Sequence, residues 1–170
     1  MPRRRGKKPL SATQQRKKEH LELCLDTKVV AGPHGTGLDR HFFLHNALPE
    51  VDIAEIDLST TFLGKSLKAP LLISSMTGGF ELARKVNRNL AKAAQQLGLA
   101  MGVGSQRVAL EESSVADSFK VRDLAPDILL LGNIGAVQLN YGYTVQECRE
   151  AVRMIPVSYT HLTLPTTPYV

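Results

Sequence analysis

Residues 71–79 read LLISSMTGG, and the same kind of stretch returns as LAMGVGSQR at 99–107 and as ILLLGNIG at 128–135. Each stretch begins with an apolar run and ends in glycine and small polar residues. The steps from Gly78 to Gly104 and from Gly104 to Gly132 are 26 and 28 residues, about the length of one strand, one helix and two loops. This order predicts an α/β fold in which parallel strands alternate with helices.

Helix signals lie between and after these runs. Phe80 to Leu97 repeats apolar residues at helical spacing, and Gly98 is typical of a helix C-cap. We expect a weaker helix over 114–124 and another from the capping box of Thr144 and Glu147 to about Ile155. Because parallel strands end on one face of a sheet, the polar residues at the three run ends should converge on one site.

The chain before residue 70 predicts a helix, an irregular segment and a hairpin. Ser11 and Gln14 fit a capping box for a helix over 12–25. Residues 27–50 are irregular, residues 51–53 and 56–58 alternate like strands, and residues 62–67 fit a tight hairpin at Gly64. We expect residues 1–10 to form a disordered basic tail.

Composition bounds the class of protein. The chain has 170 residues, enough for one domain with a core, and a net charge of +5. Residues 1–18 carry eight Lys and Arg and no acid, which leaves 13 basic and 16 acidic residues elsewhere, a net of −3. The positive charge is therefore concentrated at the N-terminus, and it does not indicate a nucleic-acid-binding groove across the fold. No run approaches the ~18 apolar residues of a membrane span, and the N-terminus lacks the apolar stretch of a secretory signal.

Two further segments affect the interpretation. Cys24 and Cys148 have no CxxC spacing, so we expect reduced, buried or half-buried thiols in a cytoplasmic protein; a disulfide is the alternative. Residues 156–170 show neither helix periodicity nor a clean strand, and 157–167 resemble the translation of a transposase-type sequencing adaptor. We therefore assign the native fold to residues 11–155 and exclude 156–170 as read-through.

Four constellations carry candidate chemistry, each with an ordinary structural alternative. Arg16, Lys17 and His20 fall within about one helical turn and can face one anion such as a diphosphate, or form a solvated basic face. The glycines at 78–79 allow a planar or phosphorylated ligand to approach the backbone, or simply make a turn.

The other two constellations follow the second and third runs. Ser105 and Gln106 can hydrogen-bond a ring edge, and Arg107 can clamp a phosphate bidentately or form a structural ion pair. Asn133 offers a donor and an acceptor at a strand end, or caps the next segment. The sequence contains no metal-ligand spacing, serine triad or Walker loop.

Together these motifs resemble type 2 isopentenyl diphosphate isomerase, the FMN-dependent enzyme on a TIM barrel. The resemblance covers about residues 12–155 and rests on R-K-x-x-H, M-T-G-G, G-S-Q-R and G-N-I-G-A-V-Q-L, in that order. It implies the N-terminal part of a (β/α)8 barrel, roughly the first three βα units after an N-terminal helix and hairpin. Because a barrel needs about 250 residues, we expect a truncated, inactive fragment whose last strand has an open edge.

The resemblance also implies residue roles. Arg16, Lys17 and His20 would bind the substrate diphosphate, and Ser105, Gln106 and Arg107 would face substrate. Flavin contacts would come from Ser75, Met76, Thr77, Ser105 and Asn133. No catalytic residue or metal ligand is expected within these 170 residues, because the flavin itself carries the proton exchange and the family's Glu ligand would lie beyond them.

The resemblance further implies the reaction and its partners. The reaction would interconvert isopentenyl and dimethylallyl diphosphate in isoprenoid biosynthesis, with FMN, NADPH as reductant and Mg2+. The full-length form would be a cytoplasmic tetramer or octamer that binds no nucleic acid. Two alternatives stay open: a non-catalytic fragment whose basic N-terminus binds RNA or another polyanion, and another FMN-dependent barrel oxidoreductase, which would not explain R-K-x-x-H.

Overall fold

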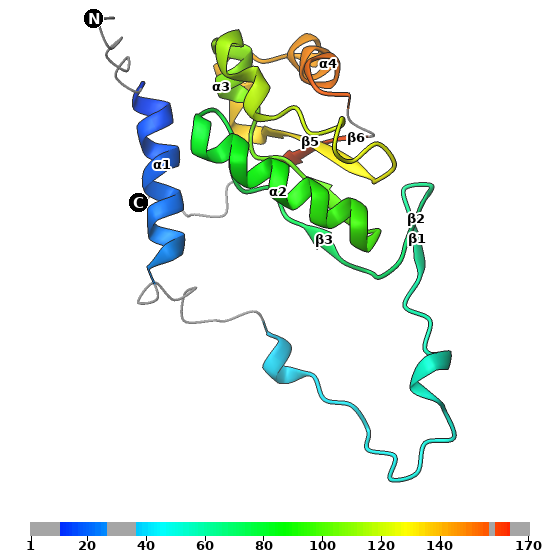
Figure 1. Ribbon diagram of the computed structural model, residues 1–170. Helices are drawn as coiled ribbons and strands as arrows, with labels where there is room; N and C mark the ends of the chain where they lie inside the picture. The colour runs from blue at the N-terminus through cyan, green and yellow to red at the C-terminus, as the bar shows by residue number, and fades with distance from the viewer. Residues whose placement is uncertain (1–10, 27–36, 157–158, 164–170) are drawn as a thin grey trace, which may run out of the picture.

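The computed structural model describes residues 11–26, 37–156 and 159–163, and it is an α/β structure built on a parallel sheet (Figure 1). Four strands lie in the order β3-β4-β5-β6, and each neighbouring pair is parallel. They are β3 (Leu72–Ile73), β4 (Ala100–Gly102), β5 (Leu130–Gly135) and β6 (Tyr159–Thr163). The three predicted core strands are confirmed as β3, β4 and β5, and the four strands form an open sheet.

The helices follow the strands in the predicted order. After β3 comes α2 (Glu81–Leu97), which ends at Gly98 in the left-handed conformation with φ +64°. After β5 comes α4 (Val145–Met154), which begins with the capping box of Thr144 and Glu147. The N-terminal helix α1 (Ala12–Leu25) begins with the capping box of Ser11 and Gln14. These three helix predictions and both capping boxes are confirmed.

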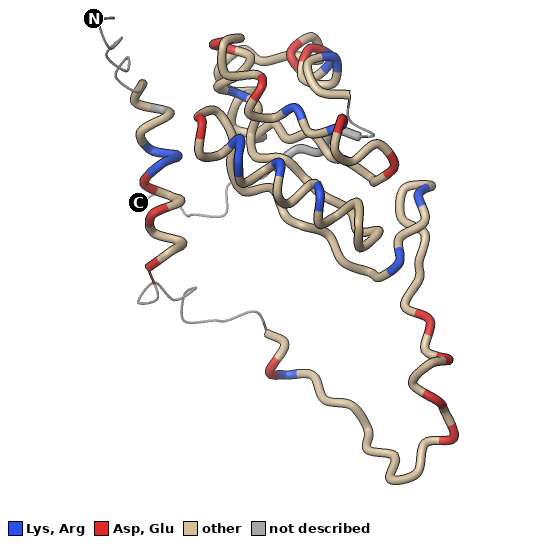
Figure 2. Tube along the Cα trace, in the orientation of Figure 1, with Lys and Arg blue, Asp and Glu red and all other residues tan. Residues whose placement is uncertain are grey.

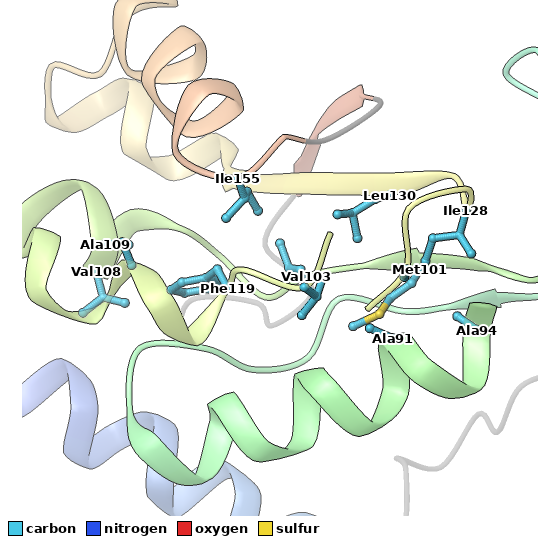
Figure 3. Close-up of a cluster of buried hydrophobic side chains, with 13 residues drawn as sticks. Ala91, Ala94, Met101, Val103, Val108, Ala109, Phe119, Ile128, Leu130 and Ile155 are labelled. Atoms are coloured by element: carbon cyan, nitrogen blue, oxygen red, sulfur yellow. The ribbon is translucent and has the colours of Figure 1, made fainter. Parts of the chain in front are cut away.

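The core has two layers because side chains alternate across the strands. Met101 and Leu130 face a cluster that includes Phe119 and the small side chains of α2 (Figure 3). On the opposite face, Leu129 and Leu131 pack with Leu67. Leu67 comes from a hairpin of β1 (Thr60–Phe62) and β2 (Lys65–Leu67) that turns at Gly64, where φ is +74°. The predicted hairpin is therefore confirmed, and its Leu67 side chain packs on this face of the sheet.

The buried face of α2 agrees with the predicted one in part. We expect that face to comprise Phe80, Ala83, Val86, Leu90, Ala93, Ala94 and Leu97. Ala83 and Ala94 are buried, but Leu97 is exposed and the other four are half-buried. The buried positions are those with small or amide side chains: Ala83, Asn87, Ala91 and Ala94. Small residues allow the helix to approach the sheet closely, so the larger apolar residues lie at the margins of the contact.

The predicted helix over 114–124 is wrong. The chain instead forms a short helix α3 (Arg107–Glu111) directly after β4, followed by the 3-10 helix η3 (Ser113–Ser118). Glu112 separates the two helices, and its carboxylate accepts a hydrogen bond from the Ser114 hydroxyl at 2.7 Å. Side chains that hydrogen-bond locally compete with helix continuation in this way.

The two predicted strands at 51–58 are also wrong. The structure has a 3-10 helix η2 (Ile53–Glu55) there, because the Asp52 carboxylate accepts a hydrogen bond from the Ala54 amide at 2.8 Å and caps it. Figure 2 shows acidic residues along this segment, which runs away from the sheet. Another 3-10 helix, η1 (Leu38–Arg40), precedes it. The apolar side chains of this region are exposed among the described residues, including Phe42, Phe43, Leu44 and Ile53.

Three further predictions concern the two cysteines, the segment after Pro156 and the N-terminal tail. Both cysteines are free thiols, as expected, and Cys148 is half-buried, but Cys24 is exposed, so the expected burial is wrong for Cys24. The segment after Pro156 was expected to contain no strand, yet Tyr159–Thr163 pairs with β5 over five registered positions. The expected open edge is thus not at β5. The predicted basic tail at 1–10 lies outside the described residues.

Candidate functional site

The carboxyl ends of β3, β4 and β5 meet through backbone hydrogen bonds. The amide of Gly104, after β4, donates to the carbonyl of Thr77, after β3, at 3.2 Å. Two residues later, the Gln106 amide donates to the carbonyl of Asn133 in β5 at 2.9 Å. The three run ends that the sequence singled out therefore lie next to one another.

This junction depends on glycine where the backbones approach. A Cβ on Gly104 would lie 2.6 Å from the Thr77 carbonyl oxygen, and a Cβ on Gly102 would lie 2.5 Å from the Ser75 hydroxyl. A Cβ on Gly78 would overlap the ring of Phe119 at 1.9 Å. A side chain at Gly104 would push the strand ends apart, and one at Gly102 or Gly78 would displace Ser75 or Phe119. The glycines therefore have a packing role here besides the turn chemistry considered from sequence.

The residues predicted to line a flavin have different environments. Thr77 is only 3% exposed, and its hydroxyl has no hydrogen-bond partner within the described part of the chain. Met76, next to it, is 64% exposed, and Ser75 is half-buried. Asn133 is buried in β5. A buried hydroxyl without a protein partner beside an exposed, flexible apolar side chain fits the edge of a planar heteroaromatic ligand.

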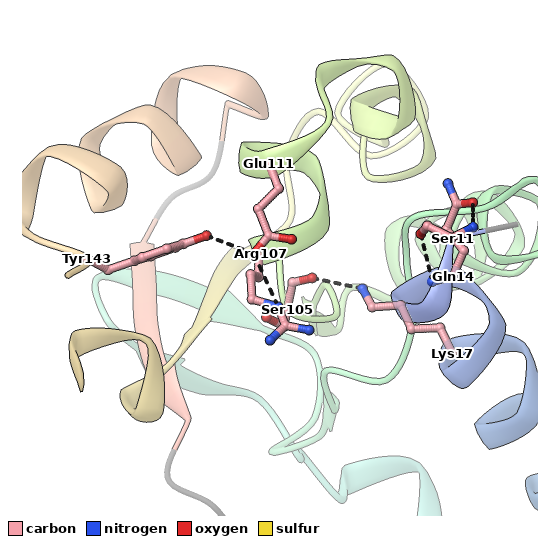
Figure 4. Close-up of polar contacts among 7 residues, drawn as sticks. All are labelled: Ser11, Gln14, Lys17, Ser105, Arg107, Glu111 and Tyr143. Atoms are coloured by element: carbon pink, nitrogen blue, oxygen red, sulfur yellow. Dashed lines mark hydrogen bonds and ion pairs between the residues drawn. The ribbon is translucent and has the colours of Figure 1, made fainter. Parts of the chain in front are cut away.

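Lys17 joins α1 to this junction (Figure 4). Its ammonium donates to the Ser105 carbonyl at 3.0 Å and lies 5.2 Å from the centroid of the Phe119 ring. Burial, together with the positive charges of Arg107 and Arg16, lowers the pKa of Lys17 from 10.5 to about 8. The carboxylate of Glu111 acts in the opposite direction. The site therefore holds more positive charge than the protein itself neutralises, as an anion-binding site should.

Arg107 is held by a neighbouring carboxylate. Its Nε lies 3.7 Å from Glu111, one turn along α3, and the Tyr143 hydroxyl donates to the same carboxylate at 3.4 Å. Burial, and then the nearby Glu111 charge, raise the pKa of Tyr143. The structural ion pair considered from sequence is thus present. Because this pair is long and Glu111 is exposed, the guanidinium can still bind a more highly charged anion.

The side chains of Arg16, His20 and Gln106 have other environments. Arg16 is exposed on α1, although its charge reaches Lys17. His20 is exposed one turn after Lys17. Gln106 is fully buried: its Nε2 donates to the Ala151 carbonyl at 2.9 Å, and its Oε1 accepts from the Asn133 amide at 3.2 Å. With both ends used on backbone groups, Gln106 supports β5 and α4, and the predicted contact with substrate is not what this geometry offers.

Sequence reasoning missed two buried polar residues beneath the junction. Asn87 of α2 donates to the carbonyls of Thr77 and Ser118, and the Ser118 hydroxyl accepts from the Gly79 amide. One signal was available: Asn87 falls between Ala83 and Ala91 at spacing of four, so a polar amide lies on the most buried stripe of the helix. Among the described residues no three His, Cys, Asp or Glu side chains group as they would around a metal ion.

The fold and this junction define an α/β protein with a candidate ligand-binding site at the carboxyl end of its parallel strands. Residues 13–122 match the FMN-dependent dehydrogenase family, so the chain belongs to that family.

The chain is also similar to curated isopentenyl-diphosphate delta-isomerases. It is 55% identical to the one from Nostoc sp. over 143 residues and 58% identical to the one from Synechococcus sp. over 142 residues, in each case 84% of this chain and 41% of the relative. The enzyme from Oceanobacillus iheyensis is 54% identical over 138 residues, 81% of this chain and 40% of that relative. This confirms the resemblance drawn from the motifs. The chain spans about two fifths of the length of these relatives.

Proposed function

We propose that this chain forms the diphosphate-binding and flavin-binding part of an isopentenyl-diphosphate delta-isomerase. The observation that carries the proposal is the junction itself, where three strand ends meet beside the cations of Lys17 and Arg107. Membership of the FMN-dependent dehydrogenase family and similarity to the isomerases support the same assignment. The rest of the site would come from further βα units of a (β/α)8 barrel, in which β3, β4 and β5 would be the first three strands.

The residues present fit FMN on structural grounds. The buried Thr77 hydroxyl offers an unused hydrogen-bonding group within the described chain, and the Met76 side chain beside it is exposed. Thr77, Met76 and Ser75 would line the ring, with Ser105 and Asn133 as further polar contacts. When bound and reduced, FMN supplies proton exchange at the allylic carbons of the substrate.

The chain's own part in the reaction is to bind and orient the diphosphate. Lys17 and Arg107 approach the junction from two elements, α1 and α3, and Arg16 adds positive charge from the same helix as Lys17. A diphosphate placed there would satisfy both cations with charge-assisted hydrogen bonds. It would also relieve the repulsion that lowers the pKa of Lys17. Orientation of this kind keeps the alkene at a fixed distance from the flavin edge.

Finer features of the proposal rest on the resemblance. NADPH would reduce the flavin, Mg2+ would bind the diphosphate together with a Glu beyond this chain, and His20 would support Arg16 and Lys17. The complete protein would be a cytoplasmic tetramer or octamer. No helix among the described residues is long and apolar enough to cross a membrane.

The test compares two lysines of α1 in a polypeptide of the relatives' full length that carries this chain. Lys17 contacts the junction, whereas Lys18 pairs with Glu22 on the exposed side of the helix. With FMN reduced by dithionite, conversion of isopentenyl diphosphate is followed by NMR. We expect Lys17→Met to lower kcat/KM at least tenfold, about 1.4 kcal/mol, and Lys18→Met to leave it within twofold. An FMN-loaded parent that converts no substrate would refute the proposal.

A further inference from the structure

The loop that joins β3 to α2 is fixed from beneath by two buried polar side chains. Asn87 is 2% exposed at the centre of α2, and Ser118 is buried at the end of η3. Neither was among the residues predicted to contact a ligand. Both lie under the backbone of residues 77–79, which carries Thr77 and the two glycines.

The Asn87 amide fixes the Thr77 peptide. Its Nδ2 donates to the Thr77 carbonyl at 3.1 Å and to the Ser118 carbonyl at 3.0 Å. Both partners are acceptors, so only a side chain with two N–H donors satisfies them at this position. The Gly104 amide donates to the same Thr77 carbonyl at 3.2 Å. The Thr77 carbonyl is therefore held by α2 on one side and by the loop after β4 on the other.

The Ser118 hydroxyl fixes the next part of the loop. It accepts from the Gly79 amide at 2.7 Å and donates to the Val115 carbonyl at 2.7 Å, so both its functions are used. Gly79 has φ +92°, a conformation that only glycine adopts without strain. The hydrogen bond from its amide holds that unusual conformation in place.

Core packing alone does not account for Asn87. The same stripe of α2 is otherwise alanine, at positions 83, 91 and 94, and a small apolar residue would pack there without a buried amide. Burying an amide is unfavourable unless all its hydrogen bonds form. Here one N–H of Asn87 donates to the Thr77 carbonyl in the candidate ligand-binding loop. The other donates to the carbonyl of Ser118, whose hydroxyl accepts from the Gly79 amide in the same loop.

We propose that Asn87 and Ser118 are positioning residues for the flavin-binding loop at 77–79. They act through the backbone of Thr77 and Gly79 and touch neither flavin nor substrate. Their hydrogen bonds set where the Thr77 hydroxyl lies and keep the loop from closing over the strand ends. This inference rests on the proposed function, since it assigns FMN to that loop.

The experiment uses a full-length polypeptide that carries this chain and pairs each variant with a matched control. Asn87→Asp replaces the two donors with acceptors, and Asn89→Asp makes the same change at an exposed position of the same helix. Ser118→Ala removes the hydroxyl, whereas Ser118→Thr keeps it. FMN affinity is measured by quenching of free flavin fluorescence, and exchange of the Gly79 and Gly104 amides is measured by NMR.

We expect both Asn87→Asp and Ser118→Ala to raise the Kd for FMN at least tenfold. Asn87→Asp should also speed hydrogen exchange of the Gly104 amide by a similar factor, and Ser118→Ala should do the same for the Gly79 amide. Asn89→Asp and Ser118→Thr should stay within threefold of the parent. Unchanged FMN affinity in Ser118→Ala, or an equal loss in Asn89→Asp, would overturn the inference.

Two other outcomes are also decisive. If Asn87→Asp does not fold, Ser118→Ala alone decides. If the parent binds no FMN, the proposed function fails, while the exchange rate of the Gly79 amide in Ser118→Ala still shows whether the loop is held as proposed.

Discussion

The lowered pKa of Lys17 predicts a specific pH dependence for diphosphate binding. In the free protein, burial and the charges of Arg107 and Arg16 lower this pKa to about 8. A bound diphosphate is a nearby negative charge, so it favours the ammonium and raises the pKa toward its ordinary value. Below pH 8 Lys17 is protonated whether or not the ligand is bound, and affinity is constant. Above pH 8 binding requires uptake of a proton, so affinity falls as pH rises.

The size of the loss in affinity follows from the difference between the pKa of Lys17 in the free protein and its pKa in the complex. Affinity should fall by up to tenfold for each pH unit above 8, until the pKa of the complex is reached. A return to about 10.4 in the complex gives a ceiling of roughly 3 kcal/mol, and solvent around the half-buried side chain reduces it. The phosphates of the substrate are fully ionised throughout this range, so their own titration does not imitate the effect.

The assay is titration calorimetry with isopentenyl diphosphate at pH 7, 8, 9 and 10, in a full-length polypeptide that carries this chain. Lys17→Arg keeps the positive charge without a titration below pH 12, so its affinity should stay nearly constant from pH 8 to 10. Lys18→Met should retain the parent's profile because Lys18 is exposed. The reasoning is refuted if the parent's affinity is flat across this range, or if Lys17→Arg loses affinity as the parent does.

Three other substitutions test separate parts of the site. Arg107→Ala should lower kcat/KM at least tenfold, because Glu111 only partly neutralises the guanidinium; unchanged steady-state kinetics would remove Arg107 from the site. Asn133→Ala should reduce the FMN retained after purification, measured from the flavin absorbance per mole of protein; full loading would indicate a purely structural role. Phe119→Ala empties a fully buried position against Gly78 and should cost about 3–5 kcal/mol in denaturant unfolding; a loss below 1 kcal/mol would contradict the packing described.

Local signals predicted the elements that local chemistry determines. The capping boxes of α1 and α4, the C-cap of α2 at Gly98 and the hairpin at Gly64 all appear where the sequence indicated them. In each case a few neighbouring residues supply the deciding hydrogen bond or the permitted φ. The parallel sheet was also predictable, because its strands are short apolar runs at a regular interval.

Elements without strong local signals were not predictable in this way. The apolar residues around η2 suggested strands, yet these residues have no sheet beside them among the described residues, and the Asp52 cap decides the local structure. Tyr159–Thr163 shows no strand pattern but pairs with β5, whose backbone groups are available to any extended segment. Pairing of this kind depends on the partner strand more than on the segment's own side chains.

The same distinction between local and non-local signals applies to the candidate site. Residues with chemically distinctive side chains, such as Lys17 and Arg107, were identified from sequence, and the structure brings them to the strand ends. Sequence could not separate Gln106 from Ser105, because adjacent polar residues in a loop point in different directions only once the loop is folded. Gln106 is buried against Ala151, and Ser105 presents its carbonyl to Lys17.

The site is therefore best understood as a backbone structure that a few side chains hold in place. Thr77 and Ser105 offer carbonyl groups to Asn87, Gly104 and Lys17, and these contacts fix the strand ends relative to α1 and α2. Lys17 has two functions in this arrangement, since it anchors α1 to the loop after β4 and carries the charge that a diphosphate would meet. When such a ligand takes over the ammonium, the hydrogen bond to Ser105 must be shared or released. Anion binding and the attachment of α1 to the sheet would then be coupled, and that coupling would depend on the half-buried Lys17 ammonium, which the exposed Lys18 beside it cannot replace.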